Sequence, residues 1–262
     1  MPRIFIVMPA YNAGENLRRT YADIPPDLRH DLLLVDDCSR DDTVAIAGEL
    51  GIPVIRHERN LGYGGNQKTC YRTALSCSAE FVAMLHPDFQ YDPKALPRLL
   101  EPLLAGDADF AFGSRMAETG SASRGGMPAH KLYINRLFCE LQNRQLGVRF
   151  SEHFSGFRAF TAELLRTVPF ERFSNDFLFD PQMVYSSLSH GSRFAEIPIP
   201  TRYEETSSTM GLRKGAKFLL EMVRHMATYA LHRRGWVSSP LYAPRAGWRQ
   251  PGVETKTPPA AS

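Results

Sequence analysis

Charged side chains follow several short apolar runs of this sequence, at the points where those runs end. Asp36 and Asp37 come directly after one run, Asp88 lies three residues beyond a second, and Arg115 follows a third. A carboxylate can hold a divalent cation, and an arginine can bind two phosphate oxygens at once. This combination favours a site for a metal-bound, phosphate-bearing ligand. The alternative is that acids at these positions only cap helices or face water.

Helical segments separate the apolar runs along the first half of the chain. Strands are expected at residues 4–8, 32–35, 53–57, 81–85 and 110–112, and helices at 15–21, 43–50, 65–75 and 95–104. Strands that alternate with helices in this way form a mostly parallel sheet with helices on both faces, an α/β fold. The carboxyl ends of such strands meet at one edge of the sheet, where ligands bind. We therefore expect the charged residues to converge there.

The second half of the chain has a less regular pattern. Helices are expected at residues 131–146, 183–189 and 213–234, extended segments at 154–160 and 197–203, and a mobile Gly/Ser-rich loop at 121–128. In the segment 213–234, apolar residues recur at helical spacing beside six Lys or Arg and one Glu. We divide the chain into an α/β domain at 1–212, a basic amphipathic helix at 213–234 and a disordered, proline-rich tail at 235–262.

Composition excludes several classes of protein. With 262 residues, 43% hydrophobic and 23% charged, the chain is neither disordered throughout nor built from many membrane spans. No apolar run of about 18 residues occurs, so no spanning helix is expected. The four cysteines form no CxxC pair, which indicates reduced thiols in a cytoplasmic protein and no structural zinc site. The net charge of +3 divides into −4 over 1–212, +5 over 213–234 and +2 over 235–262.

Two other functions fit the sequence poorly. A nicotinamide-dependent dehydrogenase would carry GxGxxG in its first strand–helix turn, but residues 9–14 read Pro-Ala-Tyr-Asn-Ala-Gly. Without those glycines, a pyrophosphate cannot approach the following helix closely. Nucleic-acid binding is disfavoured because the basic residues concentrate in one helix and no aromatic-basic stacking motif is present. We therefore expect no nucleic-acid partner.

Seven short segments stand in an order and spacing that is specific when they are taken together. They are Pro-Ala-Tyr-Asn at 9–12, Val-Asp-Asp-Cys-Ser-Arg-Asp-Asp-Thr at 35–43, Asn-Leu-Gly-Tyr-Gly-Gly-Asn at 60–66, His-Pro-Asp-Phe-Gln at 86–90, Gly-Ser-Arg at 113–115, Ser-Gly-Phe-Arg at 155–158 and Glu-Ile-Pro-Ile-Pro-Thr-Arg-Tyr at 196–203. Through them the chain resembles family 2 glycosyltransferases of the GT-A fold, from about residue 4 to residue 231. Within that family it is similar to the synthases of polyprenyl or dolichyl phosphate mannose or glucose. The resemblance implies a Rossmann-like sheet flanked by helices.

The resemblance also implies a donor site for a nucleoside-diphosphate sugar. Pro9 and Tyr11, with one of Asp36 and Asp37, would bind its nucleobase and ribose. Ala13 stands where the family often has Glu, so the identity of the base stays open.

Three basic residues would face phosphate groups by the same resemblance. Arg115 and Lys131 stand where the family places basic residues against the donor phosphates, and both would assist the departure of the diphosphate. Arg202, followed by serines at 207 and 208, falls in the acceptor-phosphate region of the family.

The segment 86–90 would supply the metal site. Asp88 matches the second acid of the DxD motif, which in the family holds a divalent metal on the diphosphate, and Gln90 matches a further ligand on the metal side. His86 replaces the first acid. An imidazole can ligate Mn²⁺ but suits Mg²⁺ poorly, so we expect a divalent metal cofactor, Mn²⁺ or Mg²⁺, with a preference for Mn²⁺. The alternative is that His86 does not ligate and Asp88 holds the site alone.

The implied reaction is the inverting transfer of a hexose from its nucleoside diphosphate to an acceptor by a metal-dependent transferase. A polyprenyl phosphate acceptor needs little general-base help, because it is already anionic. A hydroxyl acceptor on a saccharide or small molecule would need a carboxylate to take its proton, and Asp180 is the candidate. The alternative for Asp180 is the N-cap of the following helix. A third hypothesis is a non-catalytic sugar-nucleotide-binding protein, because His86 replaces an acid.

The basic helix expected at 213–234 suggests a location for the protein. Such a helix can lie on an anionic membrane surface, which would bring the site to a lipid phosphate. We therefore expect a cytoplasmic enzyme that is peripheral on the inner face of the membrane. The alternative is a helix whose apolar face is buried against its own domain or in a homodimer.

Overall fold

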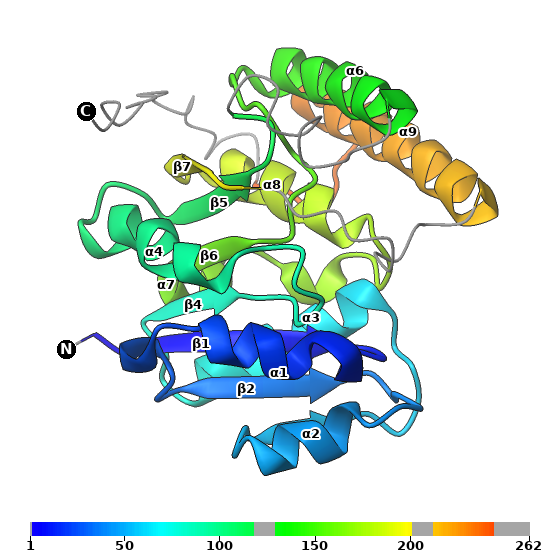
Figure 1. The fold of residues 1–262 in the computed structure, drawn as a ribbon. Coiled ribbons are helices and arrows are strands. Elements are labelled where there is room, and N and C mark those ends of the chain that lie inside the picture. The colour runs from blue at the N-terminus through cyan, green and yellow to red at the C-terminus, as the bar shows by residue number, and fades with distance from the viewer. Residues whose placement is uncertain (1, 118–128, 201–211, 244–262) are drawn as a thin grey trace.

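A seven-stranded sheet forms the centre of the molecule (Figure 1). The computed structural model describes residues 2–117, 129–200 and 212–243, with side chains from residues 132 and 215 onward in the last two segments. The strands are β1 (Ile4–Ala10), β2 (Leu32–Asp36), β3 (Val54–Arg56), β4 (Phe81–Met84), β5 (Phe110–Ser114), β6 (Arg158–Thr161) and β7 (Phe194–Pro198). Their order across the sheet is β3-β2-β1-β4-β6-β5-β7.

Every strand of this sheet runs parallel to the others except β6. β1 pairs in parallel with β2 and β4, β2 pairs with β3, and β5 pairs with β7. β6 lies between β4 and β5 and is antiparallel to both. The mostly parallel α/β sheet expected from the sequence is therefore confirmed. The carboxyl ends of β1, β2, β4 and β5 share one edge of this sheet, which we call the carboxyl edge.

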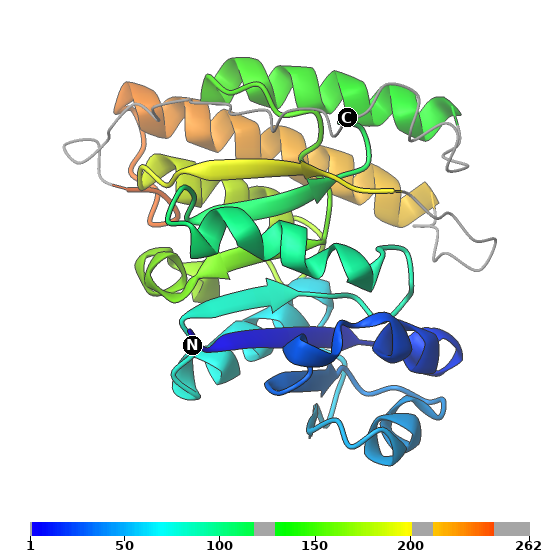
Figure 2. The same cartoon turned by 60° about the vertical axis from the view of Figure 1, so that its left-hand side comes forward.

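Helices cover both faces of the sheet (Figure 2). One face carries α1 (Gly14–Asp23), α2 (Thr43–Glu49) and α4 (Leu96–Leu104), and the other carries α3 (Tyr63–Ser76), α7 (Ala162–Thr167) and α8 (Phe179–Ser189). Short 3₁₀ helices at Pro26–Leu28, Pro93–Ala95 and Phe170–Arg172 lie in the connections that the structure describes. In β1, Phe5 and Val7 face the α3 side whereas Ile6 and Met8 face the α1 side. This alternation buries both faces of the strand, as in other covered parallel sheets.

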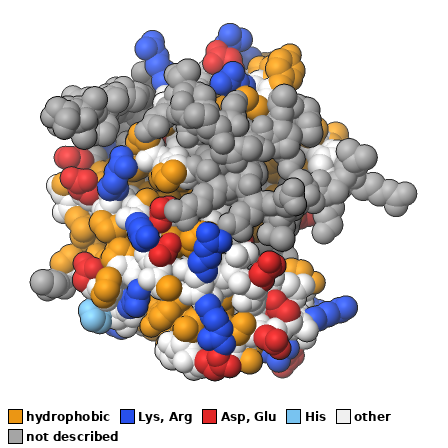
Figure 3. Space-filling model, viewed as in Figure 1, with side chains coloured by type: hydrophobic (Ala, Val, Ile, Leu, Met, Phe, Trp, Pro, Cys, Tyr) orange, Lys and Arg blue, Asp and Glu red, His pale blue; other side chains and the backbone are white. Residues whose placement is uncertain are grey.

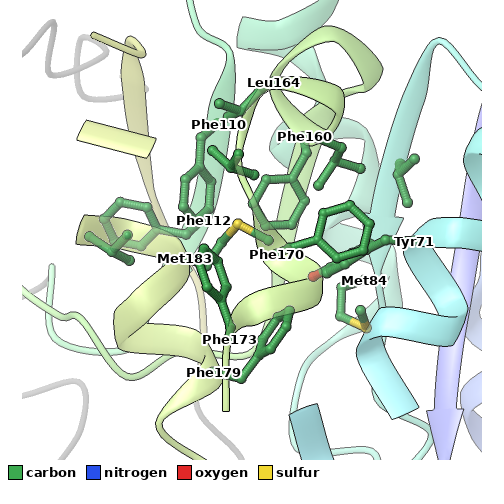
Figure 4. Packing of buried hydrophobic residues seen from close by; sticks show 14 of the residues in the cluster. Tyr71, Met84, Phe110, Phe112, Phe160, Leu164, Phe170, Phe173, Phe179 and Met183 are labelled. Atoms are coloured by element: carbon green, nitrogen blue, oxygen red, sulfur yellow. The ribbon is translucent and has the colours of Figure 1, made fainter. Parts of the chain in front are cut away.

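The core under α3 and α8 is rich in aromatic rings (Figure 4). The rings of Phe110 and Phe160 lie 4.4 Å apart, and Tyr71 of α3 meets Phe160 edge-on at 5.4 Å. Phe179 of α8 stacks on Tyr71 at 6.1 Å. Full burial of a phenylalanine stabilises a fold by roughly 1.5–3 kcal/mol. This cluster therefore fixes α3 and α8 against the strands, and both helices carry residues of the candidate site.

Two long helices, α6 (Ala129–Leu146) and α9 (Leu212–Arg234), lie side by side on the outer side of α8 (Figures 1 and 2). The Gln145 side chain donates a hydrogen bond to the Met226 carbonyl over 2.7 Å, which joins the two helices. Tyr229 of α9 is buried against Tyr185 of α8. The helix expected at 213–234 therefore forms, and its inner face packs on the domain.

Residues 235–243 fold back onto α9. The ring of Tyr242 is buried 4.9 Å from that of Tyr229, and its hydroxyl lies 2.9 Å from His225 Nδ1. His232 Nε2 donates to the Ala243 carbonyl over 3.0 Å. The disorder that we predicted from residue 235 onward does not hold for these nine positions, because buried aromatic and hydrogen-bonding contacts anchor them. Residues 244–262 lie outside the described residues.

The second half of the chain departs from the expected boundaries. β6 begins at Arg158 rather than at residue 154, and β7 covers Phe194–Pro198 rather than 197–203. Helix α7 was not expected; Thr161 caps it by accepting a hydrogen bond from the Leu164 amide. The loop expected at 121–128 lies outside the described residues. In the described part of the chain, no helix is both long and apolar enough to cross a membrane.

Candidate functional site

The turns that follow β1, β2 and β4 hold unusual backbone conformations. Asn12, Cys38 and Phe89 have positive φ angles of 51°, 64° and 58°. Such conformations cost residues other than glycine roughly 1–3 kcal/mol each, and they collect at functional sites. All three turns lie at the carboxyl edge, together with the acids singled out in the sequence. These strained turns mark the carboxyl edge as the candidate active site.

Asp37 holds the turn that leads into α3. Its Oδ1 accepts hydrogen bonds from His57 Nδ1 at 2.8 Å and from the Leu61 amide at 2.7 Å. Its Oδ2 accepts one from the Gly62 amide at 3.0 Å. The residue is 2% exposed. Because the Asp37 carboxylate accepts three hydrogen bonds from the protein itself, it stabilises the loop and is not available to a ligand.

The other residues expected at the nucleotide differ in their accessibility. Asp36 is fully buried, accepts a hydrogen bond from the Ser39 amide at 3.1 Å and lies 3.4 Å from the Arg56 guanidinium. Pro9 is buried inside β1. Tyr11, just beyond the strand, is 52% exposed. The structure thus brings these residues to the carboxyl edge, and among them Tyr11 is the most accessible to a ligand.

The segment after β4 turns His86 toward the protein and Asp88 toward solvent. His86 Nε2 lies 3.3 Å from the Tyr63 hydroxyl. Burial lowers the pKa of His86, although the nearby carboxylates of Asp88 and Asp180 oppose this shift, so the ring is neutral near pH 7. Asp88 is exposed, and its Oδ1 accepts a hydrogen bond from the backbone amide of half-buried Gln90 at 3.1 Å.

The segment 86–90 can bind a divalent metal only when a diphosphate supplies further ligands. Within the described residues, no three His, Cys, Asp or Glu side chains gather into a complete metal site. A metal on a diphosphate needs only one or two protein ligands, because phosphate oxygens and water complete its coordination. His86 and Asp88 can supply one nitrogen and one oxygen at the carboxyl edge. The residues present therefore suit a metal that binds with a diphosphate.

Asp180 lies in the first turn of α8, surrounded by hydrogen-bond donors. Tyr63 donates to its Oδ2 over 2.7 Å, and Gln67 Nε2 donates to its Oδ1 over 3.1 Å. The Arg158 guanidinium lies 3.5 Å from the same Oδ1. Leu178, not Asp180, occupies the N-cap position of α8. The capping alternative is therefore wrong for Asp180, and its carboxylate is held inside the protein.

Two of these partners were missed in the sequence. Tyr63 and Gln67 both belong to α3 and are four residues apart, so they lie on the same face of the helix. In the sequence, the segment 60–66 contributes only to the family pattern. The four-residue spacing was available as a signal, but nothing nearby in the chain pointed to Asp180 as the shared partner.

Arg115 makes a buried ion pair that the sequence also concealed. Its Nε donates to Glu152 over 2.9 Å, and a terminal nitrogen bonds the same carboxylate. Glu152 is fully buried, in the irregular segment between α6 and β6. Burial raises the pKa of the neighbouring Glu196, although hydrogen bonds from Ser151 oppose the shift. Glu152 is therefore the counter-ion of Arg115 inside the domain.

The structure does not describe the side chains of the two remaining basic residues of the expected site. Lys131 belongs to the first turn of α6, but its side chain lies outside the described residues. Arg202 lies outside the described residues altogether.

Comparison with known sequences decides the family. The profile of glycosyl transferase family 2 matches residues 5–168. This chain belongs to glycosyl transferase family 2. The match includes β1 to β5, β6 and α7, and with them the turns at the carboxyl edge. The family expected from the sequence motifs is therefore confirmed.

Two named relatives align with most of this chain. It is 27% identical over 206 residues to undecaprenyl-phosphate mannosyltransferase of Micrococcus luteus, an alignment that covers 75% of this chain and 82% of the relative. It is 26% identical over 207 residues to polyprenol monophosphomannose synthase of Mycolicibacterium smegmatis, covering 75% and 76%.

A solved structure shares the fold. The present structure matches that of glucosyl-3-phosphoglycerate synthase of Mycobacterium tuberculosis with a TM-score of 0.63. That synthase was crystallised with Mn²⁺, UDP and glucosyl-3-phosphoglycerate. The match covers 91% of this chain and 82% of that one at 21% sequence identity. At this identity the likeness shows the GT-A fold that both proteins adopt.

Proposed function

We propose that this family 2 glycosyltransferase moves a hexose from a nucleoside-diphosphate sugar to a polyprenyl phosphate, with inversion at the anomeric carbon. The donor would lie on the carboxyl edge, with its base against the exposed ring of Tyr11. His86 and Asp88 would hold a divalent metal on the diphosphate. When bound, the metal stabilises the negative charge that develops on the leaving diphosphate.

The contacts of Asp180 are the observation on which we base the proposed acceptor. A hydroxyl acceptor requires a base that can take a proton as the new bond forms. The Asp180 carboxylate is 6% exposed and is engaged by Tyr63, Gln67 and Arg158. A proton on either oxygen would cost it one of these interactions. This arrangement favours a phosphate acceptor, whose oxygen is already anionic and needs no base.

The relatives support the same acceptor class. The mannosyltransferase of M. luteus is named for undecaprenyl phosphate and the synthase of M. smegmatis for a polyprenol monophosphate product. Each aligns with about three-quarters of this chain. We extend that acceptor class to the present protein as part of the proposal.

A transfer assay tests this function. Labelled UDP-, GDP- and dTDP-sugars are incubated with Mn²⁺ and either undecaprenyl phosphate or hydroxyl acceptors. We expect product with the phosphate acceptor. Asp88→Asn should lower kcat/KM by about 100-fold or more, because metal stabilisation of the leaving group contributes several kcal/mol. Asp107→Asn, an exposed acid just before β5, is the matched control and should keep full activity. Transfer to hydroxyl acceptors alone would refute the proposed acceptor.

The outer surface of α6 and α9 supports a peripheral location on a membrane. Exposed apolar side chains line both helices, namely Tyr133, Ile134, Leu137 and Leu141 on α6 and Leu220 and Val223 on α9. Lys and Arg side chains accompany them at the top of the molecule (Figure 3). Residues 213–234 alone carry a net charge of +5. An apolar surface with basic neighbours is suited to an anionic bilayer.

Vesicle sedimentation tests this location. The full chain should sediment with phosphatidylglycerol vesicles but not with vesicles of phosphatidylcholine alone. Leu137→Asp should abolish sedimentation, whereas Leu104→Asp, at a similarly exposed leucine on α4, should not. Absence of sedimentation by the unmodified chain would refute membrane docking. A dimer in sedimentation velocity that Leu137→Asp dissociates would instead assign this surface to a homodimer.

A further inference from the structure

A chain of hydrogen bonds runs from His86 into the protein interior. Its members are His86 after β4, Tyr63 at the start of α3, and Asp180 in α8. The Tyr63 hydroxyl lies 3.3 Å from His86 Nε2 and 2.7 Å from Asp180 Oδ2. Tyr63 thus connects the predicted metal-binding segment to an acid that the proposed reaction does not use as a base.

The environment of Asp180 sets the direction of this chain. Gln67 donates to its Oδ1, the Arg158 guanidinium lies beside the same oxygen and Tyr63 donates to its Oδ2, so both carboxylate oxygens act as acceptors. The Tyr63 hydroxyl has one hydrogen, which it donates to Asp180. Its oxygen can then only accept from His86. The bond at His86 Nε2 therefore requires a hydrogen on Nε2, which leaves the lone pair of the neutral ring on Nδ1.

Packing holds the ring in this orientation. Tyr63 and His86 stack with an angle of 4° between their planes and 5.5 Å between their centres. Phe177 stacks on the ring of Tyr63 at 4.9 Å. At position 156, a Cβ would lie 2.8 Å from His86 Nε2, so the glycine there lets the Nε2 edge rest against the backbone. The opposite edge carries Nδ1, and none of the described residues makes a hydrogen bond to it.

We propose that Tyr63 and Asp180 are positioning residues that hold His86 in its Nε2–H tautomer, so that Nδ1 serves with Asp88 as a ligand for the divalent metal. Metal-binding histidines commonly donate their second ring nitrogen to an oxygen that fixes ring and tautomer. Here a tyrosine would fill that place and a buried carboxylate would orient the tyrosine. The inference rests on the proposed metal-dependent transfer.

Nitrogen-15 NMR of the full chain tests the tautomer directly. At pH 8, without metal, the long-range ¹H–¹⁵N pattern of a neutral histidine shows which nitrogen carries the hydrogen, and His86→Asn identifies the signals of His86. We expect the Nε2–H pattern in the unmodified chain and a mixture of tautomers in Tyr63→Phe. Tyr91→Phe is the matched control. Its hydroxyl accepts from the Gly156 amide at 2.9 Å and makes no bond to His86, so that variant should keep the Nε2–H pattern.

Metal affinity provides the second readout. Electron paramagnetic resonance of Mn²⁺ in the presence of UDP should show about 10-fold weaker binding in Tyr63→Phe, the size of effect expected when an outer partner of a metal ligand is lost. Tyr91→Phe should bind as the unmodified chain does. An unchanged Mn²⁺ affinity in folded Tyr63→Phe would overturn the proposal.

If Tyr63→Phe fails to fold, the tautomer of His86 in the unmodified chain still tests the proposal. A hydrogen on Nδ1 of His86 in that chain would overturn the inference, because Nδ1 could then not ligate. This result is independent of the transfer assay. A chain with the Nε2–H pattern but no transferase activity would contradict the proposed function and leave the positioning of His86 intact.

Discussion

Replacing Asp37 by asparagine separates a loop-supporting role from a nucleotide-binding role. Asp37→Asn keeps the size of the side chain but turns one carboxylate oxygen into an NH₂ group. Both oxygens accept hydrogen bonds in the protein, from His57 and Leu61 on one side and from Gly62 on the other. Whichever way the amide turns, its NH₂ group must face a buried donor.

The smaller penalty arises when the NH₂ group faces the Gly62 amide. The Gly62 amide then keeps its bond to Asn60 Oδ1 at 3.1 Å, but the NH₂ group of the new asparagine faces a donor and has no acceptor there, which costs about 1–3 kcal/mol. The bonds from His57 and Leu61 survive, but each loses charge assistance worth about 1 kcal/mol. The free energy of unfolding should therefore fall by about 3–5 kcal/mol. For a domain of this size, about 2–4 °C is lost per kcal/mol, so Tm should fall by roughly 10 °C.

Calorimetry gives Tm, and titration with UDP and Mn²⁺ well below the transition gives the affinity of the folded variant. Asp42→Asn makes the same chemical change at an exposed N-cap whose side chain makes no capping hydrogen bond, so it should alter stability by less than about 0.5 kcal/mol. If Asp37 instead binds the ribose, Asp37→Asn would lose UDP affinity at an unchanged Tm. That outcome would refute the reasoning.

Three further variants probe the interior by denaturation. Phe160→Ala removes a fully buried ring from the aromatic core and should cost about 3–5 kcal/mol in urea unfolding. Glu152→Gln removes the buried negative charge that pairs with Arg115 and should cost a similar amount, whereas Glu140→Gln, in an exposed pair, should cost less than about 1 kcal/mol in the same assay. Burial lowers the pKa of His225 from 6.5 to about 4. The contribution of neutral His225 to stability is therefore complete above pH 6.5 and declines by about 1.4 kcal/mol per pH unit toward pH 4. As the pH is lowered through this range, the urea midpoint of His225→Phe should fall less steeply than that of the unmodified chain.

The strands of the first half could be predicted because burial leaves a direct trace in the sequence. A parallel strand covered on both faces needs apolar side chains at successive positions, and the run 32–35 coincides with β2 (Leu32–Asp36). β6 could not be placed in the same way, because it begins at Arg158. The Arg158 guanidinium is buried and donates to the backbone carbonyls of His153, Ser155 and Asp180. Because these carbonyls satisfy its charged group, Arg158 can be buried although its side chain is polar, and hydropathy gives no sign of a buried strand there.

The location of the site could be predicted, but the tasks of its acids could not. The convergence of strand ends follows from the parallel topology alone. The partners of Asp37 lie 20 to 25 residues along the chain, and Tyr63 lies 117 residues from Asp180. These pairings depend on how α3 and α8 pack on the aromatic core. Spacing within the sequence carries no information about such long-range donors.

The charge at the metal-binding segment leads to a final prediction. Because His86 is neutral, it and Asp88 provide one negative charge, so a divalent cation there would keep a formal charge of +1. A pair of carboxylates would cancel the charge. The remaining charge attracts an anionic diphosphate, while a single carboxylate holds the free cation more weakly.

Metal and nucleotide should therefore bind with strong coupling, which must be reciprocal. We expect Mn²⁺ alone to bind weakly and UDP to raise its affinity by at least about 10-fold, a coupling of about 1.4 kcal/mol. His86→Asp restores the second acid and should bind free Mn²⁺ more tightly with a smaller gain from UDP, as calorimetric titrations of each ligand with and without the other would show. Equal coupling in both proteins would mean that His86 does not set the charge seen by the diphosphate.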